Sequence, residues 1–310
     1  MATTHDITVN VFPGGFNWPL FVAREKGFFA RNDLRVALQD TPNSVAQMTG
    51  LSAGRFEIAM TAIDNIVAYV EGQGEAPIGP QPEFRAVMGS DSGFLSLVAR
   101  PGIATIADLA GKTVSVDAMT TGYAFVLFEI LREAGLELGS YKIERAGGMV
   151  QRWTALAAGA QDATLLSAPY NILAKAQGFS ELAPAVKVIG AYQGNVAAVR
   201  RSWAAAHRDQ VAGFIRSYKT AVDWLYDVKN RAEALAILMK NVPQISPALA
   251  APTYALLLDP ITGFCRDGAI DRSGVQKVLE LRSRYSATKA LLTEPARYSD
   301  LSFFQETSGG

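Results

Sequence analysis

The stretch NWPLFVAREKGFF, residues 17–29, decides the fold because it predicts the helix of a first strand–helix–strand unit. Residues 7–11 before it and residues 34–38 after it are typical of β-strands. Pro19 would fall in the first helical turn, where its missing N–H costs nothing, and Gly27 can end the helix. Such a unit joins two parallel strands. The loop ahead of its helix then lies at the carboxyl edge of the sheet, where α/β folds bind ligands.

The alternation of strands and helices continues on both sides of two polar, glycine-containing breaks, which predicts two lobes. We expect an α/β fold in which each lobe has a central, mostly parallel sheet flanked by helices. Residues 1–92 and 196–310 would form lobe I, with the C-terminal helices, and residues 93–195 would form lobe II. The chain would cross between the lobes near residues 92–95 and 192–196, which predicts a hinge at the crossings and a ligand cleft between the lobes.

Later segments show two further patterns. A β-branched run at residues 186–189 predicts the last strand of lobe II. The apolar spacing over residues 211–225 predicts an amphipathic helix. More helices are expected at residues 232–241, 247–258 and 272–285, so the C-terminal third is predicted to be mostly helical.

The composition is that of a globular protein with balanced charge. The chain has 310 residues, with 29 Lys and Arg against 29 Asp and Glu. Proteins that bind nucleic acid normally have a basic excess, so this balance argues against such a partner. Cys265 is the single cysteine, and no apolar run is long enough to span a bilayer. The first residues lack a leader pattern, which indicates either a cytoplasmic protein or a removed signal peptide with an added Met1.

Four segments carry a resemblance to a known family. Residues 17–29 (NWPLFVAREKGFF), 53–59 (AGRFEIA), 108–114 (DLAGKTV) and 120–122 (TTG) resemble the NMT1/THI5-like and sulfonate-type periplasmic substrate-binding proteins of ABC transporters. The similarity extends over about residues 7–226. It implies the type II periplasmic-binding fold, in which two α/β lobes close on a ligand. It also implies a periplasmic monomer that delivers its ligand to an ABC transporter permease, with the signal peptide removed.

Five segments are expected to face the cleft, because each follows a predicted strand or begins a predicted helix. For most of these residues, helix capping, turn formation or core packing is the alternative role. The candidate ligand-binding residues are Phe16, Asn17, Trp18, Thr61, Asp64, Asn65, Ser90, Ser92, Thr120, Thr121, Gly122, Tyr123, Arg152, Ser167, Tyr170 and Tyr192.

The chemistry of these residues favours an anion. The hydroxyl groups of Thr120 and Thr121, with free N–H groups at a helix N-terminus, are suited to negative charge. Arg152 could bind a carboxylate or sulfonate with two parallel hydrogen bonds, although most arginines are solvated. The aromatic rings of Phe16, Trp18, Tyr123 and Tyr192 could stack on a flat ligand.

We therefore expect a solute-binding protein for a small organic anion, with an aromatic compound or a sulfonate as candidate forms. A neutral pyrimidine related to thiamine synthesis and nitrate are the alternatives. An enzyme such as a THI5-like synthase is less favoured, because the cysteine-rich motif of those synthases is absent and His5, His207 and Cys265 fall outside the predicted cleft loops. No cofactor and no metal site is expected.

Overall fold

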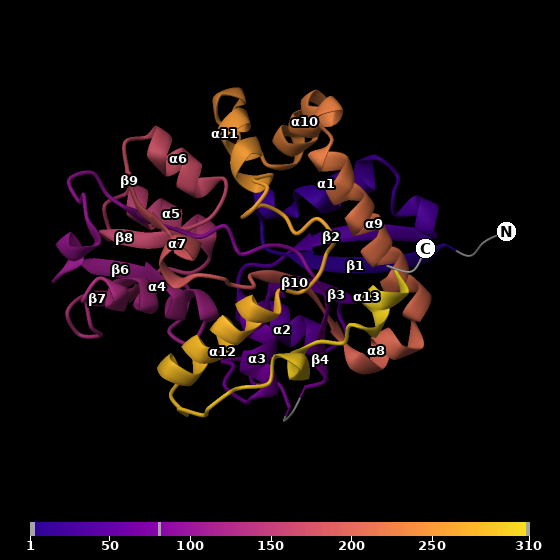
Figure 1. The fold of residues 1–310 in the computed structure, drawn as a ribbon, viewed down its shortest axis with the longest axis horizontal. Coiled ribbons are helices and arrows are strands. Elements are labelled where there is room, and N and C mark those ends of the chain that lie inside the picture. The colour runs from indigo at the N-terminus through magenta and orange to yellow at the C-terminus, as the bar shows by residue number, and fades with distance from the viewer. Residues whose placement is uncertain (1–3, 80–81, 308–310) are drawn as a thin grey trace.

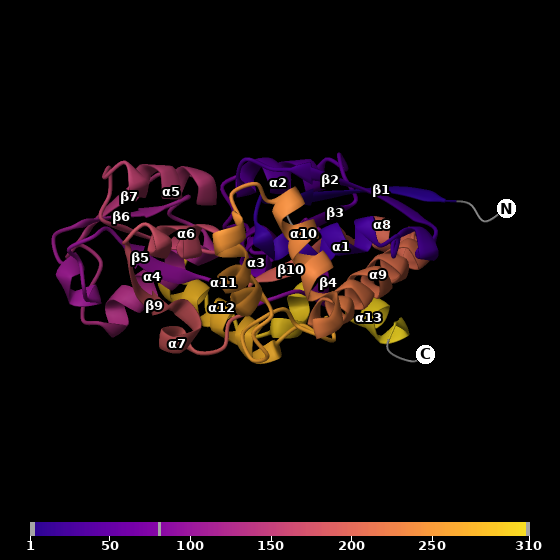
Figure 2. The ribbon, with the colours of Figure 1, turned by 90° about the horizontal axis from the view of Figure 1, so that it is seen from above.

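Two five-stranded sheets, each flanked by helices, form two lobes (Figure 1). The computed structural model describes residues 4–79 and 82–307. The lobe around the sheet that contains the first strand is called lobe I below, and the other is called lobe II. Figure 2 shows the same two lobes side by side when the molecule is seen from above. The predicted fold class, α/β with two lobes, is confirmed.

The sheet of lobe I has the strand order β2–β1–β3–β10–β4. Strand β1 is parallel to β2 and β3, whereas β10, which enters from lobe II, is antiparallel to both of its neighbours. The strands are β1 (His5–Val11), β2 (Leu34–Asp40), β3 (Ile58–Ala62), β4 (Phe84–Gly89) and β10 (Asn195–Arg200).

The sheet of lobe II repeats this plan with the order β7–β6–β8–β5–β9. Here β6 is parallel to β7 and β8, and β5, which enters from lobe I, is antiparallel to β8 and β9. The strands are β5 (Ser96–Ala99), β6 (Thr113–Val116), β7 (Lys142–Arg145), β8 (Ala163–Leu166) and β9 (Ser180–Pro184). Each sheet therefore has one antiparallel member, the strand that arrives from the other lobe.

Helices connect the strands and form the C-terminal third of the chain. The α-helices are α1 (Trp18–Glu25), α2 (Ser44–Ser52), α3 (Ile63–Val70), α4 (Gly122–Glu133), α5 (Met149–Ala157), α6 (Tyr170–Ala176), α7 (Ala185–Ile189), α8 (Arg201–Ala206), α9 (Arg208–Tyr226), α10 (Arg231–Asn241), α11 (Pro247–Leu257), α12 (Arg272–Tyr285) and α13 (Ser302–Glu306). The 3-10 helices are η1 (Gly15–Asn17), η2 (Ala30–Asn32), η3 (Ile106–Leu109), η4 (Val228–Asn230) and η5 (Pro295–Tyr298).

The segment that predicted the first unit folds as expected. Pro19 lies in the first turn of α1, and Gly27 follows the helix with φ +69°, a left-handed conformation that favours glycine. Helix α1 packs against α9 and α10, and Leu20 and Val22 are fully buried there. Strand β2 then pairs with β1 along its whole length, from His5 opposite Leu34 onward.

Side chains alternate between the two faces of each sheet, as the period of a strand requires. In β10, Val196 and Ala198 pack on the side of α2 and α3, whereas Ala197 and Val199 pack on the side of α1 and α9. Both faces are apolar because helices cover both, which is the usual condition of a mostly parallel sheet.

Helix α12 lies between the lobes and contacts both (Figures 1 and 2). It packs against α3 of lobe I and α4 of lobe II, and its apolar side chains belong to a hydrophobic cluster that continues from one lobe into the other. Glu129 of α4 accepts hydrogen bonds from Arg284 at 2.6 Å and from Tyr285 at 2.7 Å. Helix α12 is therefore a third link between the lobes, in addition to the two chain crossings.

The strand predicted at residues 186–189 is wrong. This segment forms the short helix α7, and Ser180–Pro184 supplies the edge strand β9 instead. Ala185 and Ile189 are four residues apart and both buried, because α7 packs against α4. Packing against a helix thus overrides the β-propensity of Val186, Val188 and Ile189.

In residues 4–79 and 82–307, none of the helices combines the length and the apolar character that crossing a bilayer would need.

Arg282 of α12 donates to both carboxylate oxygens of Asp64 in α3, at 2.7 and 2.5 Å, and both side chains are buried. We expect this pair to matter for stability. Replacing Arg282 by Met should lower the free energy of unfolding by about 3–5 kcal/mol, because the Asp64 carboxylate would stay buried without its cation. The double variant Arg282→Met/Asp64→Leu removes both charges and should recover most of that loss. Urea unfolding of the three proteins tests this, and equal losses in the single and double variants would contradict it.

Glu129 should make folding sensitive to acid. Its burial acts to raise its pKa, but hydrogen bonds from Arg132, Tyr285 and Arg284 outweigh burial and lower the pKa to about 2. The unfolded chain has the ordinary value of about 4.3, so ionised Glu129 stabilises the fold above that pH and this stabilisation is lost as the pH falls toward 2. Urea midpoints from about pH 5 to about pH 3 should fall more steeply for the natural protein than for Glu129→Gln. Parallel curves would refute the role of Glu129.

Candidate functional site

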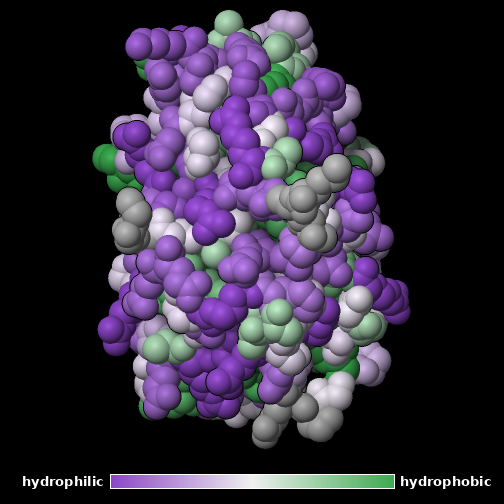
Figure 3. Space-filling view, turned by 90° about the vertical axis from the view of Figure 1, so that its right-hand side faces the viewer, coloured by the Kyte–Doolittle hydropathy of each residue, from purple (hydrophilic) through white to green (hydrophobic). Residues whose placement is uncertain are grey.

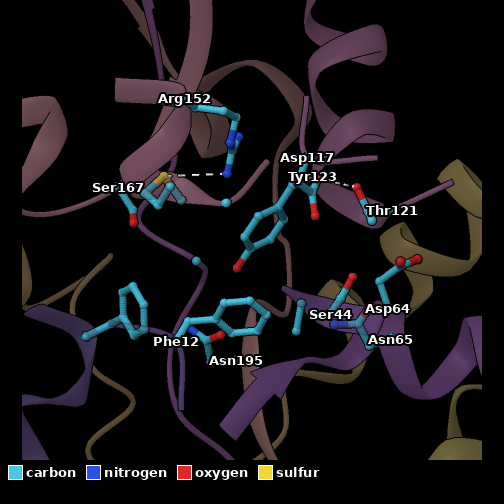
Figure 4. Close-up of a pocket in the computed structure, with 16 residues that line it drawn as sticks. Phe12, Ser44, Asp64, Asn65, Asp117, Thr121, Tyr123, Arg152, Ser167 and Asn195 are labelled. Carbon is cyan, nitrogen blue, oxygen red and sulfur yellow. Dashed lines mark hydrogen bonds between the residues drawn. The ribbon is translucent and has the colours of Figure 1, made fainter. Parts of the chain in front are cut away.

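A cavity of about 60 Å³ lies between the two lobes. Its walls come from the first turns of α2, α3, α4 and α5 and from the segments after β1 and β8. Figure 4 shows that side chains from both lobes point into this space. Helix N-termini carry N–H groups without intrahelical partners, so the fold places several donors around one small volume.

Arg152, from α5, is a cavity cation without a carboxylate partner. Its side chain is buried, with the residue 4% exposed. Nη1 donates to the carbonyl oxygen of Leu165 at 2.9 Å, and Nη2 is 3.5 Å from Met149 Sδ. Among the described residues, Nε has no partner and no carboxylate forms an ion pair with the guanidinium. Burial lowers the pKa of Arg152, although the negative charge of Asp117 acts against it, and an arginine in a protein remains charged.

Further donors line the same space. Ser167 Oγ is buried and has no hydrogen-bond partner in the part of the chain that the structure describes. Helices α4 and α5 both begin at the cavity. Thr121 precedes α4 without capping it through its hydroxyl, and Gly148, which precedes α5, has no side chain to cap with. The first N–H groups of these helices are therefore available to negative charge, which the helix dipole also favours.

Asp64 lines the cavity, but its charge is neutralised. Arg282 donates to Oδ1 at 2.7 Å and to Oδ2 at 2.5 Å, and both side chains are buried. Arg282 also donates to the carbonyl oxygen of Thr120, in lobe II, at 2.9 Å. This bidentate pair therefore fixes the contact between the lobes.

The N-terminus of α4 approaches α3 closely because Gly122 has no side chain. A Cβ atom at this position would lie 2.5 Å from Asp64 Cβ. The conformation described here is therefore one in which the lobes are in close contact. Thr120 Oγ1 of lobe II also donates to Glu75 Oε1 of lobe I, at 2.8 Å.

Asp91 connects the two chain crossings behind the cavity. Its carboxylate accepts from Gly93 N at 2.7 Å, from Ser90 Oγ at 2.8 Å and from Asn195 Nδ2 at 3.0 Å. Burial raises the pKa of Asp91 above the usual range, although the hydrogen bonds from Asn195, Ser90 and Gly93 act against it. Asn195 itself lines the cavity, so the crossings and the cavity share one network.

The structure brings half of the predicted site residues together. These residues lie around the one cavity, from both lobes, and they are Phe16, Asp64, Asn65, Thr121, Gly122, Tyr123, Arg152 and Ser167. Thr121 differs from the expected role, because its hydroxyl donates to Asp117 Oδ1 at 2.7 Å. Tyr123 extends between the lobes, and burial and the charge of Asp91 raise its pKa.

Three other predicted residues do not line this cavity, contrary to what the sequence suggested. They are Asn17, Trp18 and Tyr170. Trp18 is fully buried in lobe I, where its indole N–H donates to the carbonyl oxygen of Ala234 at 3.0 Å. Asn17 donates to the carbonyl oxygen of Phe12. Asn17 and Tyr170 both line a second cavity, of about 350 Å³. Successive residues of a helix are rotated by about 100° around its axis, so two residues apart they point to nearly opposite sides, and Phe16 faces the ligand cavity whereas Trp18 faces the core.

Five other predicted residues do not line the ligand cavity. Thr61 accepts a hydrogen bond from Asn65, and Ser90 bonds with Tyr218. The hydroxyl of Thr120 is directed toward Glu75, away from the ligand cavity. Ser92 and Tyr192 line a separate cavity next to Asp91. The ring of Tyr192 lies 6.4 Å from that of Tyr123, and its buried hydroxyl has no hydrogen-bond partner in the described chain. A ligand-binding role of these five residues stays a prediction.

Several cavity residues were not among the candidates. They are Phe12, Ser44, Ala62, Gly93, Asp117, Gly148, Met149 and Asn195. Two of them could have been identified from the sequence by their position relative to a predicted strand or helix. Asp117 directly follows strand β6, and Ser44 begins α2, so both occupy the strand-end or helix-start positions that predicted the other residues.

Solved structures of ligand-binding proteins resemble this fold. The ligand-binding component of an ABC-type import system from Staphylococcus aureus, solved with zinc bound, is 16% identical with a TM-score of 0.78, and the match covers 99% of this chain and 100% of that one. The periplasmic nitrate-binding protein NrtA from Synechocystis is 12% identical with a TM-score of 0.75, covering 98% and 88%. The periplasmic aliphatic sulphonate binding protein SsuA from Escherichia coli is 17% identical with a TM-score of 0.71, covering 98% and 100%.

At the level of sequence, a search of curated proteins found no significant relative. A family model described as NMT1/THI5 like matches residues 17–232. The matched range includes helix α1, both chain crossings and the helices that border the cavity. The chain belongs to the NMT1/THI5-like family.

Proposed function

We propose that this chain is the solute-binding protein of an ABC importer. It captures a small organic anion in the cavity between its lobes and delivers this ligand to a membrane permease. The location that suits this role is the periplasm. We further propose that it acts as a monomer. The face of lobe I seen in Figure 3 is mainly hydrophilic, and its hydrophobic residues are scattered rather than gathered in one patch.

The single observation behind an anionic ligand is that Arg152 is buried with no ion pair and with Nε unbonded in the described chain. A charge that is buried without a partner costs free energy, which a bound anion would offset. Nε of Arg152 and Oγ of Ser167 are buried donors that find no acceptor in the described chain, and both lie at this cavity. A carboxylate or sulfonate could accept from both groups at once.

The second cavity is larger but less suited to specific binding. Its volume is about 350 Å³, against about 60 Å³ for the cavity at Arg152. However, its arginine, Arg24, is exposed to solvent and already donates to Asn241 Oδ1 at 2.7 Å. Water screens an exposed charge, so buried, unpaired donors are the stronger indication of a ligand site.

The cavity volume also limits the ligand. Ligand pockets of drug-sized molecules measure about 300–1,000 Å³, so this closed arrangement suits a much smaller compound. We infer that ligands enter when the lobes separate about the two crossings, near residues 92–95 and 192–196, because hinge closure around a ligand is a known motion of two-lobed binding proteins. The names of two structural neighbours, for nitrate and aliphatic sulphonate, also refer to small anions.

We infer that the ligand is bound and released without reaction. His5 and His207 do not line the cavity. The thiol of Cys265 lies at the separate cavity next to Asp91, where it is directed at Asp267 Oδ1. Mass spectrometry of a ligand recovered after long incubation with the protein should show it unchanged, and a new product would support the enzyme alternative.

Replacing Arg152 by Met should weaken anion binding without weakening the fold. We expect the Kd of the anion that gives the largest thermal shift, from a screen of carboxylates, sulfonates, nitrate and pyrimidines, to rise at least about tenfold, because hydrogen bonds to charged groups contribute about 1.5–3 kcal/mol. The free energy of unfolding without ligand should stay the same or rise, because a buried, unpaired charge is removed. Arg55→Met, at an exposed arginine, is the matched control.

Calorimetric titration and urea unfolding measure both quantities. An Arg152→Met protein that is less stable but binds the anion normally would show that this arginine has only a structural role. Preferential binding of a neutral pyrimidine by the natural protein would also contradict the anion proposal.

Gly122→Ala should weaken binding by preventing the lobes from approaching. The added Cβ would meet Asp64 Cβ and Cγ at 2.5 Å in this closed arrangement, and separation of the lobes would relieve that contact. We expect a higher Kd but an unchanged urea midpoint in the absence of ligand. Gly79→Ala, where nothing lies within 4 Å of the added atom, is the control. Natural affinity in Gly122→Ala would refute the claim that closure at this contact accompanies binding.

A further inference from the structure

Side-chain donors and side-chain acceptors occupy different sides of the cavity. In Figure 4, Arg152 and Ser167 lie on one side of Tyr123, and Thr121, Asp64 and Asn65 lie on the other. The first side offers unpaired donors, as described above. The second side offers oxygen atoms, so a ligand that spans the cavity would meet donors at one end and acceptors at the other.

Asp117 is the carboxylate that is available to a ligand. Of the two aspartates in the cavity wall, Asp64 already has both oxygens bound by Arg282. Asp117 accepts one hydrogen bond, from Thr121 Oγ1, and in the described chain it forms no ion pair within 4 Å. It is only half-buried, so its second oxygen can bind a cationic group.

Asn65 adds a second acceptor near Thr121. Its Nδ2 donates to Thr61 Oγ1 at 2.8 Å, which commits the amide nitrogen to the protein. No described residue donates to its Oδ1, and the residue borders both the main cavity and a smaller one that Thr121 also lines. A carboxylate and an amide oxygen together are suited to a protonated amine, which has several N–H donors.

We propose that the ligand is a small zwitterion, whose acidic group binds Arg152 and Ser167 and whose ammonium group binds Asp117 and Asn65. This inference rests on the proposed function and names the class of its ligand. Arg152 and Asp117 are the charged residues of the cavity wall that form no ion pair within 4 Å in the described chain, and their opposite charges act on each other across the cavity. A simple anion would leave Asp117 without a partner, and a simple amine would leave Arg152 without one, so only a molecule with both charges satisfies both.

The same arrangement predicts discrimination against analogues. A site that is built to bind a polar group of its ligand rejects an analogue that lacks it, because the buried group of the protein is left unpaired. Asp117 is therefore a residue that determines specificity, and it should select amino acids or amino sulfonates over the parent acids. The volume of about 60 Å³ restricts them to short carbon chains.

Matched pairs of ligands test this. Calorimetric titrations would compare 3-aminopropionate with propionate, 4-aminobutyrate with butyrate, and 2-aminoethanesulfonate with ethanesulfonate. We expect at least one amino compound to bind at least about tenfold more tightly than its parent acid. Asp117→Asn should bring the affinities of that pair together, whereas Glu137→Gln, at an exposed glutamate of lobe II, should preserve the difference.

Each other outcome overturns the proposal in a recognisable way. If the parent acids or other simple anions bind as tightly as the amino compounds, or if neither series binds, the zwitterion is wrong. Binding of simple anions with loss in Arg152→Met would leave the anion function intact. If ethylamine binds more tightly than any acid, both the zwitterion and the anion proposal fail.

Discussion

A buried guanidinium without a counter-ion is the constraint on which the site depends. Arginine cannot lose its proton to avoid the cost of burial, as a buried lysine can. The groups that contact Arg152, the carbonyl oxygen of Leu165 and the sulfur of Met149, are neutral. The fold therefore holds a charge whose cost is only partly offset within the chain. Such a group is more readily explained by a ligand than by stability, and this is why the small cavity, and not the larger one beside α1, is the candidate site.

The junction between the lobes uses the opposite arrangement, in which charges are fully paired. Arg282 binds both oxygens of Asp64 and reaches the carbonyl oxygen of Thr120 in the other lobe. Helix α12 thereby contacts both lobes next to the cavity. Any motion that opens the cleft must move α12 with one lobe or break these contacts. The stability of the closed form and the affinity for ligand are thus coupled through the same few residues.

Much of this could be predicted from sequence because strand ends and helix starts follow local rules. Asp64, Asn65 and Gly122 reach the cavity for the reason that identified them, their position after a strand or at a helix start. The direction of a side chain is less local. Trp18 occupies a helix start but faces the core, because its direction depends on how α1 packs against α10. That Arg152 forms no ion pair could not be predicted, since the distance from its guanidinium to the carboxylates around the cavity is a property of the tertiary structure.

The central claim is that Arg152 and Ser167 bind the acidic group of the ligand between closed lobes. The most direct measurement is a crystal structure of the protein with the compound that raises its melting temperature most. The account predicts that the acidic group lies within hydrogen-bond distance of Arg152 Nε and Ser167 Oγ, with Gly122 against Asp64. Electron density for the ligand in the cavity beside Asn17 and Tyr170, with the space at Arg152 filled only by water, would contradict it.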